Sequence, residues 1–170
     1  MRILVLEDDR VQQGRIEQTL LDIGRSRNLR LEIDIAKSYG DVEKYSQYFD
    51  NYQLYLLDLE IDGERERGFQ VAQQIRERDP FTSIVFVSTH SEALPLAFRY
   101  HLSALDFISK DQPEEDYRHQ LERCLDYVLA VDKRENMRLF TYSFEGRRGF
   151  TLPYHEILAF ETSVESHRIK

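Results

Sequence analysis

The pattern of apolar and polar positions over residues 1–130 predicts strands separated by helices. Five short apolar runs, RILVL, LEIDI, QLYLL, SIVFV and LDFI, have the length and composition of buried or half-buried strands. Between the first two runs, Val11, Ile16, Leu20 and Ile23 recur at roughly helical spacing. Repeated strand–helix units are typical of an α/β fold with a parallel sheet.

The pattern changes near residue 133. From there, the segment that begins RLFTYSFEGRRGF predicts short strands with glycine turns and no helix. About 35 such residues are too few to bury an independent core, so they are expected to begin a domain rather than to complete one. The predicted organisation is an α/β domain over residues 1–130, a linker over 131–137 and an incomplete all-β part over 138–170.

Composition narrows the class of protein. With 41% hydrophobic and 32% charged residues the chain has an ordinary globular composition, and no apolar run approaches the ~20 residues of a membrane span. The N-terminal MRILVLEDD lacks the apolar core of a secretory signal, and the single cysteine, Cys124, excludes an internal disulfide framework. We therefore expect a cytoplasmic protein without membrane insertion.

The charge is unevenly distributed along the chain. Residues 133–170 hold seven Lys and Arg against five Glu, a net of +2, so residues 1–132 carry −10 when the whole chain carries −8. An acidic N-terminal part and a weakly basic C-terminal part indicate two units with different partners.

Charged and hydroxyl side chains follow the apolar runs at their carboxyl ends. Glu7 and Asp8 follow the first run, Asp58 the third, Ser88 the fourth and Lys110 the fifth. In an open parallel sheet, sites form beyond the carboxyl ends of the strands. If the strand order is 2-1-3-4-5, these four strands are neighbours, and the side chains are expected to converge.

Such a cluster needs compensating positive charge. Each pair of carboxylates at ~4 Å repels by about 4 kcal/mol at an effective dielectric of ~20. Lys110 supplies one positive charge, and a hard divalent cation such as Mg²⁺ would supply two. The combination suits phosphoryl transfer to Asp58, with the Ser88 hydroxyl binding a phosphoryl oxygen. Alone, each residue is more often a turn, cap or surface residue, so the joint placement carries the prediction.

The same segments resemble the receiver domain of two-component response regulators. The motifs are ILVLEDD, LLDLEIDG, VFVSTHSE and SALDFISKD. The resemblance implies a flavodoxin-like (CheY-like) doubly wound sheet of five parallel strands. It also implies phosphorylation of Asp58 by a membrane sensor histidine kinase, and Mg²⁺ held by Glu7, Asp8, Asp58 and the backbone carbonyl of Glu60. Mg²⁺-dependent self-phosphorylation from small phosphodonors and autodephosphorylation are then expected, without any other enzyme activity.

The resemblance further implies a switch. Ser88 would move toward the phosphoryl group and Phe107 would follow into the vacated space, which changes the face formed by the fourth helix, the fifth strand and the fifth helix. Phosphorylation would thereby promote a homodimer. The residues expected on that face are Arg99, Tyr100, His101, Asp111 and Arg118.

The segment LPYHEILAFETSVESHRIK resembles the opening strands of the LytTR DNA-binding domain. Together with the receiver motifs it is similar to the peptide-pheromone regulators of Gram-positive bacteria, the ComE, BlpR and AgrA group. That resemblance implies transcriptional control of competence, bacteriocin or virulence genes through direct repeats in promoter DNA. His167 is the candidate base-reading residue, provided that the LytTR domain is complete.

Two other functions stay open at this point. One is a pseudo-receiver, an interaction module that takes no phosphate. The other is an aspartate-nucleophile phosphatase, although such enzymes usually place a second Asp two residues after a nucleophile on the first strand, and here Glu60 follows Asp58 on the third. The chain also departs from many receivers, with Ile61-Asp62 in place of Met-Pro and Asp111 in place of a proline after the lysine.

Overall fold

The computed structural model describes residues 1–90, 92, 94–136, 139–142, 150–153 and 157. The chain divides into two compact units, Met1–Val128 and Leu129–Lys170. Within the described part, no helix combines the length and the apolar character that a membrane crossing requires.

The first unit is built on a five-stranded sheet with the order β2-β1-β3-β4-β5, and every neighbouring pair is parallel. This confirms the predicted fold class for the α/β part. The strands are β1 (Arg2–Leu6), β2 (Glu32–Ala36), β3 (Leu54–Leu57), β4 (Ser83–Ser88) and β5 (Asp106–Ser109). The side chains of β3 are buried throughout, because helices cover both faces of the central strands.

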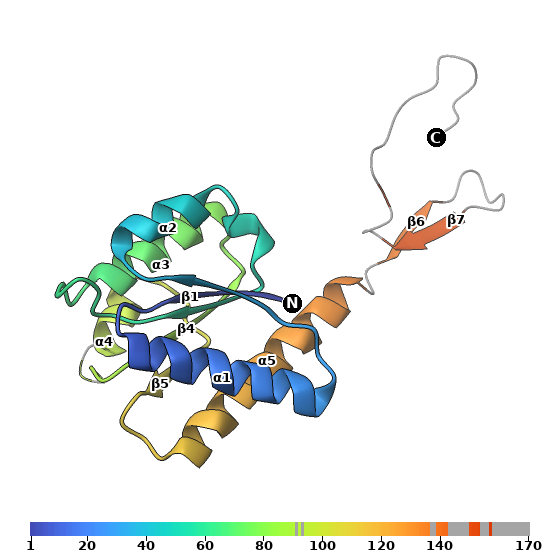
Figure 1. Ribbon diagram of the computed structural model, residues 1–170. Coiled ribbons are helices and arrows are strands. Elements are labelled where there is room, and N and C mark those ends of the chain that lie inside the picture. Colours follow the sequence, from blue (N-terminus) through green and yellow to red (C-terminus); the bar gives the residue numbers. More distant parts are fainter. Residues whose placement is uncertain (91, 93, 137–138, 143–149, 154–156, 158–170) are drawn as a thin grey trace. The chain divides into compact units, whose positions relative to one another are not determined.

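The helices lie on both faces of the sheet (Figure 1). They are α1 (Arg10–Arg27), α2 (Tyr39–Ser46), the 3₁₀ turn η1 (Phe49–Asn51), α3 (Arg67–Arg78), α4 (Leu94–Arg99) and α5 (Glu114–Asn136). One apolar cluster joins the sheet to α1 and α5, with Ile16, Leu20 and Leu121 among its members. The second joins the opposite face to α2, α3 and α4, with Phe69 and Phe86 among its members.

Helix α1 begins directly behind the first strand end. The Asp9 carboxylate accepts hydrogen bonds from the backbone N–H groups of Val11 and Gln12, both at 2.8 Å, and so caps the helix. Val11 shares the helical spacing of Ile16 and Leu20 but not their burial, because the residue is 76% exposed. The buried Gln13 faces the sheet beside the cap, and its amide donates to the carbonyl oxygen of Glu7 at 2.7 Å.

Helix α5 continues to Asn136, so residues 131–136, which the sequence analysis assigns to a linker, are helical. The second unit also contains an antiparallel pair of strands, β6 (Leu139–Tyr142) and β7 (Phe150–Pro153). The greater part of the segment that resembles LytTR, including His167, lies outside the described residues. Cys124 is a buried residue of α5, and burial raises the pKa of its thiol to about 12.

The connection between α4 and β5 is held by a side chain from α3. His101 and Ser103 in this connection have positive φ angles of 51° and 48°. The Arg76 guanidinium donates to the carbonyl oxygens of Leu102 at 2.7 Å and Ser103 at 3.2 Å. It also donates to the carbonyl oxygen of Thr82 at 2.7 Å, which ties the connection to the start of β4.

Candidate functional site

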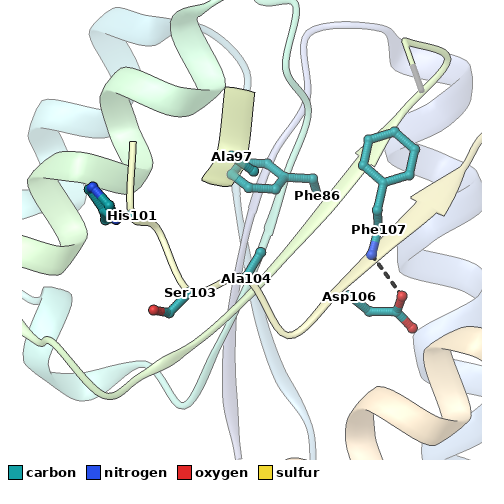
Figure 2. Close-up of a pocket in the computed structure, with 7 residues that line it drawn as sticks. All are labelled: Phe86, Ala97, His101, Ser103, Ala104, Asp106 and Phe107. Carbon is teal, nitrogen blue, oxygen red and sulfur yellow. Dashed lines mark hydrogen bonds between the residues drawn. The ribbon is translucent and has the colours of Figure 1, made fainter. Parts of the chain in front are cut away.

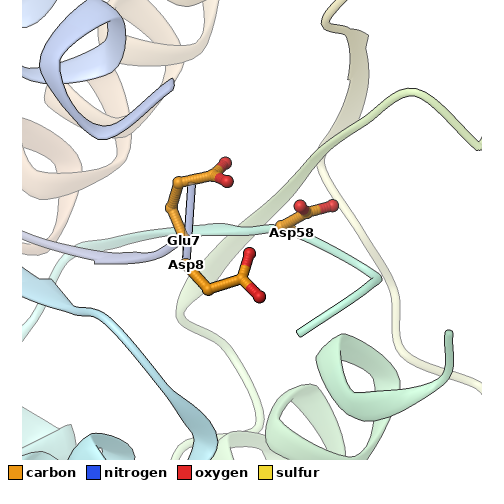
Figure 3. Close-up of side chains that lie close together, drawn as sticks. All are labelled: Glu7, Asp8 and Asp58. Atoms are coloured by element: carbon orange, nitrogen blue, oxygen red, sulfur yellow. The ribbon is translucent and has the colours of Figure 1, made fainter. Parts of the chain in front are cut away.

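Three carboxylates gather at the carboxyl edge of the sheet (Figure 3). Ligand oxygens of Glu7, Asp8 and Asp58 lie within 4.8 Å of one another. Glu7 and Asp8 come directly after β1 and Asp58 directly after β3, and these strands are paired in register from Ile3–Leu54 to Leu6–Leu57. Adjacent parallel strands that end together therefore deliver the carboxylates to one place.

Lys110 supplies the positive charge that these carboxylates need. Its Nζ lies 2.5 Å from Oδ2 of Asp58 and 2.6 Å from Oε2 of Glu7. All three side chains are buried, with exposed residue fractions of 8% for Lys110, 6% for Asp58 and 0% for Glu7. The backbone N–H of Lys110 donates to the carbonyl oxygen of Ser88 at 3.1 Å, so the lysine is anchored to the neighbouring strand end.

Glu7 and Lys110, which are both buried, have shifted pKa values. Burial raises the pKa of the Glu7 carboxyl to about 7, against the opposing attraction of Lys110. Burial lowers the pKa of the Lys110 ammonium, but Asp58 and Glu7 outweigh it, and the net pKa is raised. The lysine therefore stays charged near neutral pH, while Glu7 is poised between its two protonation states.

A glycine allows the backbone behind Asp58 to pack closely. Gly68, in the first turn of α3, donates its N–H to the carbonyl oxygen of Leu59 at 3.1 Å. A Cβ at Gly68 would overlap the carbonyl oxygen of Asp58 and lie only 2.8 Å from Cα of Leu59. The position of the Asp58 backbone therefore depends on the absence of a side chain at residue 68.

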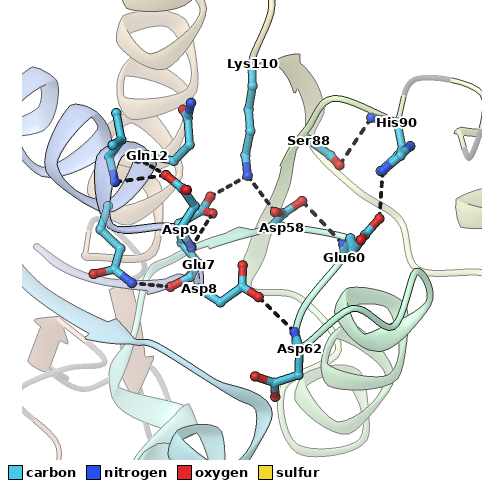
Figure 4. A network of polar contacts seen from close by, with 12 residues as sticks. Glu7, Asp8, Asp9, Gln12, Asp58, Glu60, Asp62, Ser88, His90 and Lys110 are labelled. Atoms are coloured by element: carbon cyan, nitrogen blue, oxygen red, sulfur yellow. Dashed lines mark hydrogen bonds and ion pairs between the residues drawn. The ribbon is translucent and has the colours of Figure 1, made fainter.

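The loop after β3 orients Asp8. The backbone N–H of Asp62 donates to Oδ2 of Asp8 at 2.9 Å (Figure 4). Asp62 and Gly63 both have positive φ, of 55° and 76°, so the loop turns tightly there. The Asp62 carboxylate accepts in turn from the backbone N–H of Tyr39 at 3.0 Å, which links the loop to α2.

A second polar bridge spans the ends of β3 and β4. Ser88 is buried, and its Oγ accepts from the backbone N–H of His90 at 3.3 Å. The His90 ring contacts the Glu60 carboxylate at 2.9 Å and the Glu92 carboxylate at 3.0 Å. The backbone N–H of Glu60 approaches Oδ1 of Asp58 at 3.4 Å (Figure 4). Glu60 therefore contacts Asp58 with its backbone and His90 with its side chain.

The residues expected at the switch and at the dimer face have different neighbours in the structure. Phe107 and His101 line one cavity between α4 and β5 (Figure 2). The Tyr100 ring packs on Phe69 with centroids 5.6 Å apart, and its hydroxyl donates to Glu66 at 3.3 Å. Asp111 is exposed, and its N–H donates to Ser109.

Arg118 lies on the α1 side of α5, where it lines a recess with Arg15 and Asp22. Arg118 therefore does not line the same cavity as His101. The side chain of Arg99 lies outside the described part of the chain.

Sequence reasoning missed several residues that build this site. Gly68 and His90 were not singled out, nor was Arg15, whose guanidinium donates to the carbonyl oxygen of Lys110 at 2.6 Å and lies 4.0 Å from the centre of the Tyr117 ring. Gly68 carries a usable signal, since a glycine in the first turn of a helix that follows an active-site loop indicates close backbone approach. His90 and Arg15 contact partners that are distant in sequence, so no local pattern indicates their contribution.

The donor set fits a hard divalent cation. All three clustered side chains offer oxygen, the ligand that Mg²⁺ prefers. Oε2 of Glu7 is buried and, apart from the lysine ammonium, has no hydrogen-bond partner among the described residues. The acidic cluster is thus of the type that holds Mg²⁺ in receiver domains.

A CheY-like sheet with an acidic cluster and a lysine at its carboxyl edge defines a regulatory phospho-acceptor module. Residues 3–122 match the model of the response regulator receiver domain, and the chain belongs to this family.

Curated relatives align with nearly the whole chain. Accessory gene regulator protein A of Staphylococcus epidermidis is 30% identical over 99% of this chain, which spans 72% of that protein. The protein of the same name from Staphylococcus aureus is 28% identical with the same coverage. Among solved structures, the N-terminal domain of a response regulator/sensory box/GGDEF 3-domain protein from Carboxydothermus hydrogenoformans has a TM-score of 0.61 at 20% identity, over 79% of this chain and 98% of that one.

Proposed function

We propose that Asp58 accepts a phosphoryl group from a sensor histidine kinase and that this modification controls transcription. The observation that carries the proposal is the placement of Asp58. Its carboxylate is almost buried, 2.5 Å from Lys110 Nζ, and shares a 4.8 Å cluster with Glu7 and Asp8. An isolated carboxylate in such surroundings would be unfavourable, so the cluster is better explained by a chemical task than by stability alone.

In the proposed reaction an Asp58 carboxylate oxygen attacks the phosphorus atom of the donor. A new P–O bond forms while the bond between phosphorus and the donor atom breaks, and the donor leaves with that electron pair. Lys110 is within reach of the same carboxylate, so its ammonium stabilises the negative charge on the transferring oxygens. The Ser88 hydroxyl, at the end of the neighbouring strand, would donate to one of them.

Mg²⁺ would be held by Asp8 and Asp58, with Glu7 and the carbonyl oxygen of Glu60 completing the protein ligands. When bound, the ion neutralises negative charge on the phosphoryl oxygens and on the carboxylates. The contact between the Asp62 N–H and Asp8 holds one ligand in place before any metal arrives.

The switch would use Ser88 and Phe107. Ser88 loses its contact with the His90 N–H when its hydroxyl turns to the phosphoryl group, and the half-buried Phe107 ring moves inward in response. The altered α4–β5–α5 surface would then form a homodimer. Arg99, Tyr100, His101 and Asp111 remain residues proposed to contribute to it.

The output would be control of peptide-pheromone genes through a LytTR-type DNA-binding domain. This part rests on the sequence of residues 138–170 and on the relatives whose name describes an accessory gene regulator. His167 would read promoter bases when that domain is complete.

Intact-mass measurement after incubation with acetyl phosphate tests the first step. With Mg²⁺, the protein should gain the mass of one phosphoryl group, and with a chelator it should not. Asp58→Asn should keep the fold and lose the label, whereas Asp50→Asn, at an exposed position of η1, should be labelled normally. Equal labelling of the Asp58 variant would refute the assignment, and an unlabelled wild-type protein would favour the pseudo-receiver.

A further inference from the structure

Arg15 of α1 connects the end of β5 to the start of α5. Its guanidinium donates to the carbonyl oxygen of Lys110 at 2.6 Å and to Oε2 of Glu114 at 2.9 Å. Cζ of Arg15 also lies 4.0 Å from the centre of the buried Tyr117 ring. Only 20% of the Arg15 side chain is exposed. The guanidinium is therefore held by three groups, and its planar shape fixes the direction of each contact.

Lys110 has both of its backbone polar groups bound. Its N–H donates to the carbonyl oxygen of Ser88 at the end of β4, and its carbonyl oxygen accepts from Arg15. Lys110 stands one residue beyond β5, where the chain turns toward α5. The contacts from β4 and from α1 therefore restrict the peptide groups before and after this lysine.

The position of this backbone determines where the lysine ammonium lies. Lys110 Nζ is 2.5 Å from Oδ2 of Asp58 and 2.6 Å from Oε2 of Glu7, at the end of a long and flexible side chain (Figure 4). A displaced backbone would move the ammonium away from the carboxylates. Misplacing a reacting group by ~1 Å can slow a reaction about 100-fold, even when the altered residue is far from the reacting atoms.

A simpler explanation is that Arg15 only joins two helices. Arg27 makes contacts of that kind, because it also joins α1 to α5, through Glu122 at 3.2 Å and Asp126 at 2.6 Å. Partly exposed ion pairs of this type contribute little to stability. Arg15 differs from Arg27 because one of its contacts reaches the backbone of Lys110, which the joining of two helices does not require.

We propose that Arg15 is a positioning residue for phosphoryl transfer to Asp58. It holds the Lys110 backbone, so that the ammonium group remains at the Asp58 carboxylate while negative charge develops on the phosphoryl oxygens. This inference rests on the proposed function and adds to it a residue that does not touch the reacting atoms. A hydrogen bond from a cationic guanidinium to a carbonyl oxygen is stronger than one between neutral groups. Glu114 balances the charge of Arg15, so the guanidinium acts on Lys110 through geometry.

Hydrogen exchange of the Lys110 amide tests the contact without any phosphorylation. Arg15→Met keeps an aliphatic stem and removes every donor, and Arg27→Met makes the same change at the other contact between α1 and α5. In ¹H–¹⁵N NMR, the Lys110 amide should exchange with solvent about ten-fold or more faster in Arg15→Met than in Arg27→Met, because its hydrogen bond to Ser88 opens more often. Equal exchange in the two variants would refute the hold of Arg15 on Lys110.

The rate of labelling by acetyl phosphate with Mg²⁺ tests the consequence for the reaction. Arg15→Met should be labelled about ten-fold or more slowly than the wild type, and Arg27→Met should be labelled at the wild-type rate. Glu114→Gln removes the ion pair but leaves the bond from Arg15 to the Lys110 carbonyl, so its rate should stay within about three-fold of the wild type. Equal slowing by Glu114→Gln and Arg15→Met would assign the effect to the ion pair and overturn the proposal.

Mg²⁺ binding separates positioning from general damage to the site. Lys110 is not a proposed ligand and its ammonium repels the cation, so Arg15→Met should bind Mg²⁺ at least as tightly as the wild type in an NMR titration. Weaker Mg²⁺ binding in parallel with slower labelling would mean that the whole carboxylate cluster is disturbed, and it would count against the positioning role. If the wild type accepted no phosphoryl group while Lys110 exchange still depended on Arg15, the proposed function would fail. Labelling of Arg15→Met at the wild-type rate would refute only the role of Arg15.

Discussion

The replacement Gly68→Ala tests whether the phospho-acceptor backbone depends on close packing. The new Cβ would overlap the carbonyl oxygen of Asp58 and lie 2.8 Å from Leu59 Cα and 2.9 Å from the carbonyl carbon of Asp58. These neighbours are backbone atoms at the end of a buried strand, so they cannot rotate away as a flexible side chain would. The start of α3 or the loop after β3 must shift instead.

The expected cost follows from two opposing terms. Overpacking in a dense interior costs roughly 1–3 kcal/mol, and replacing glycine by alanine in a helix returns at most about 1 kcal/mol. A net loss of about 1–2 kcal/mol should lower the melting temperature by roughly 2–8 °C in a protein of this size. Displacement of the Asp58 carboxylate should also slow labelling by acetyl phosphate about ten-fold or more.

Gly14→Ala is the matched control. Gly14 is an exposed residue of α1, and a Cβ added there would have no other atom within 4 Å, so alanine should stabilise the protein by up to about 1 kcal/mol. Urea denaturation gives the free energy of unfolding of both variants, and intact mass gives their labelling rates. If Gly68→Ala were as stable as Gly14→Ala and labelled at the wild-type rate, the close-packing argument would be wrong.

Three further predictions concern metal, pH and DNA. Asp8→Lys should abolish Mg²⁺-dependent labelling, because it replaces a ligand by a competing cation; labelling that proceeds equally well in chelator would contradict the metal's role. The folded-state pKa of Glu7 is raised to about 7, so the folded state holds this proton more tightly and the stability it contributes below pH ~4.5 is lost as the pH rises toward 7. Urea denaturation in chelator should therefore show that, between pH ~4.5 and 7, the unfolding free energy of the wild type falls by roughly 2–3 kcal/mol relative to that of Glu7→Gln. If the unfolding free energies of the two proteins changed in parallel with pH, burial would not be the cause of the raised Glu7 pKa. The 170-residue chain should bind promoter DNA weakly at physiological salt, since it offers few phosphate contacts. A chain extended through a whole LytTR domain should bind direct repeats as a dimer. Tight, sequence-specific binding by the 170-residue chain in gel shifts would overturn this prediction.

The sequence was sufficient to predict the sheet and the convergence of its charged ends. Apolar runs at period two or in continuous stretches identify strands, and acids or a lysine placed directly after them must meet once the strands are parallel neighbours. Glu7, Asp58 and Lys110 could be predicted on this basis because their position depends only on where each strand ends.

The remaining features depend on contacts that no local pattern encodes. Val11 has helical spacing, but it lies in the first turn of α1 and is exposed, which periodicity alone does not indicate. The contact of His90 with Glu60 joins two loops 30 residues apart. Helix α5 continues to Asn136, although residues 131–136 were predicted to form a linker; residues 129–136, LAVDKREN, include several good helix formers.

The Arg76 contacts bear on how receivers can be recombined. A chimera that transplants residues 100–105 into another receiver would carry two left-handed residues, His101 and Ser103, without the guanidinium that holds the carbonyl groups of this connection. The transplanted connection would then relax toward ordinary backbone angles and shift the start of β5. The exchangeable module is therefore discontinuous, because it consists of the connection together with Arg76 from α3. A graft designed from a continuous segment would lack the side chain that holds its backbone in place.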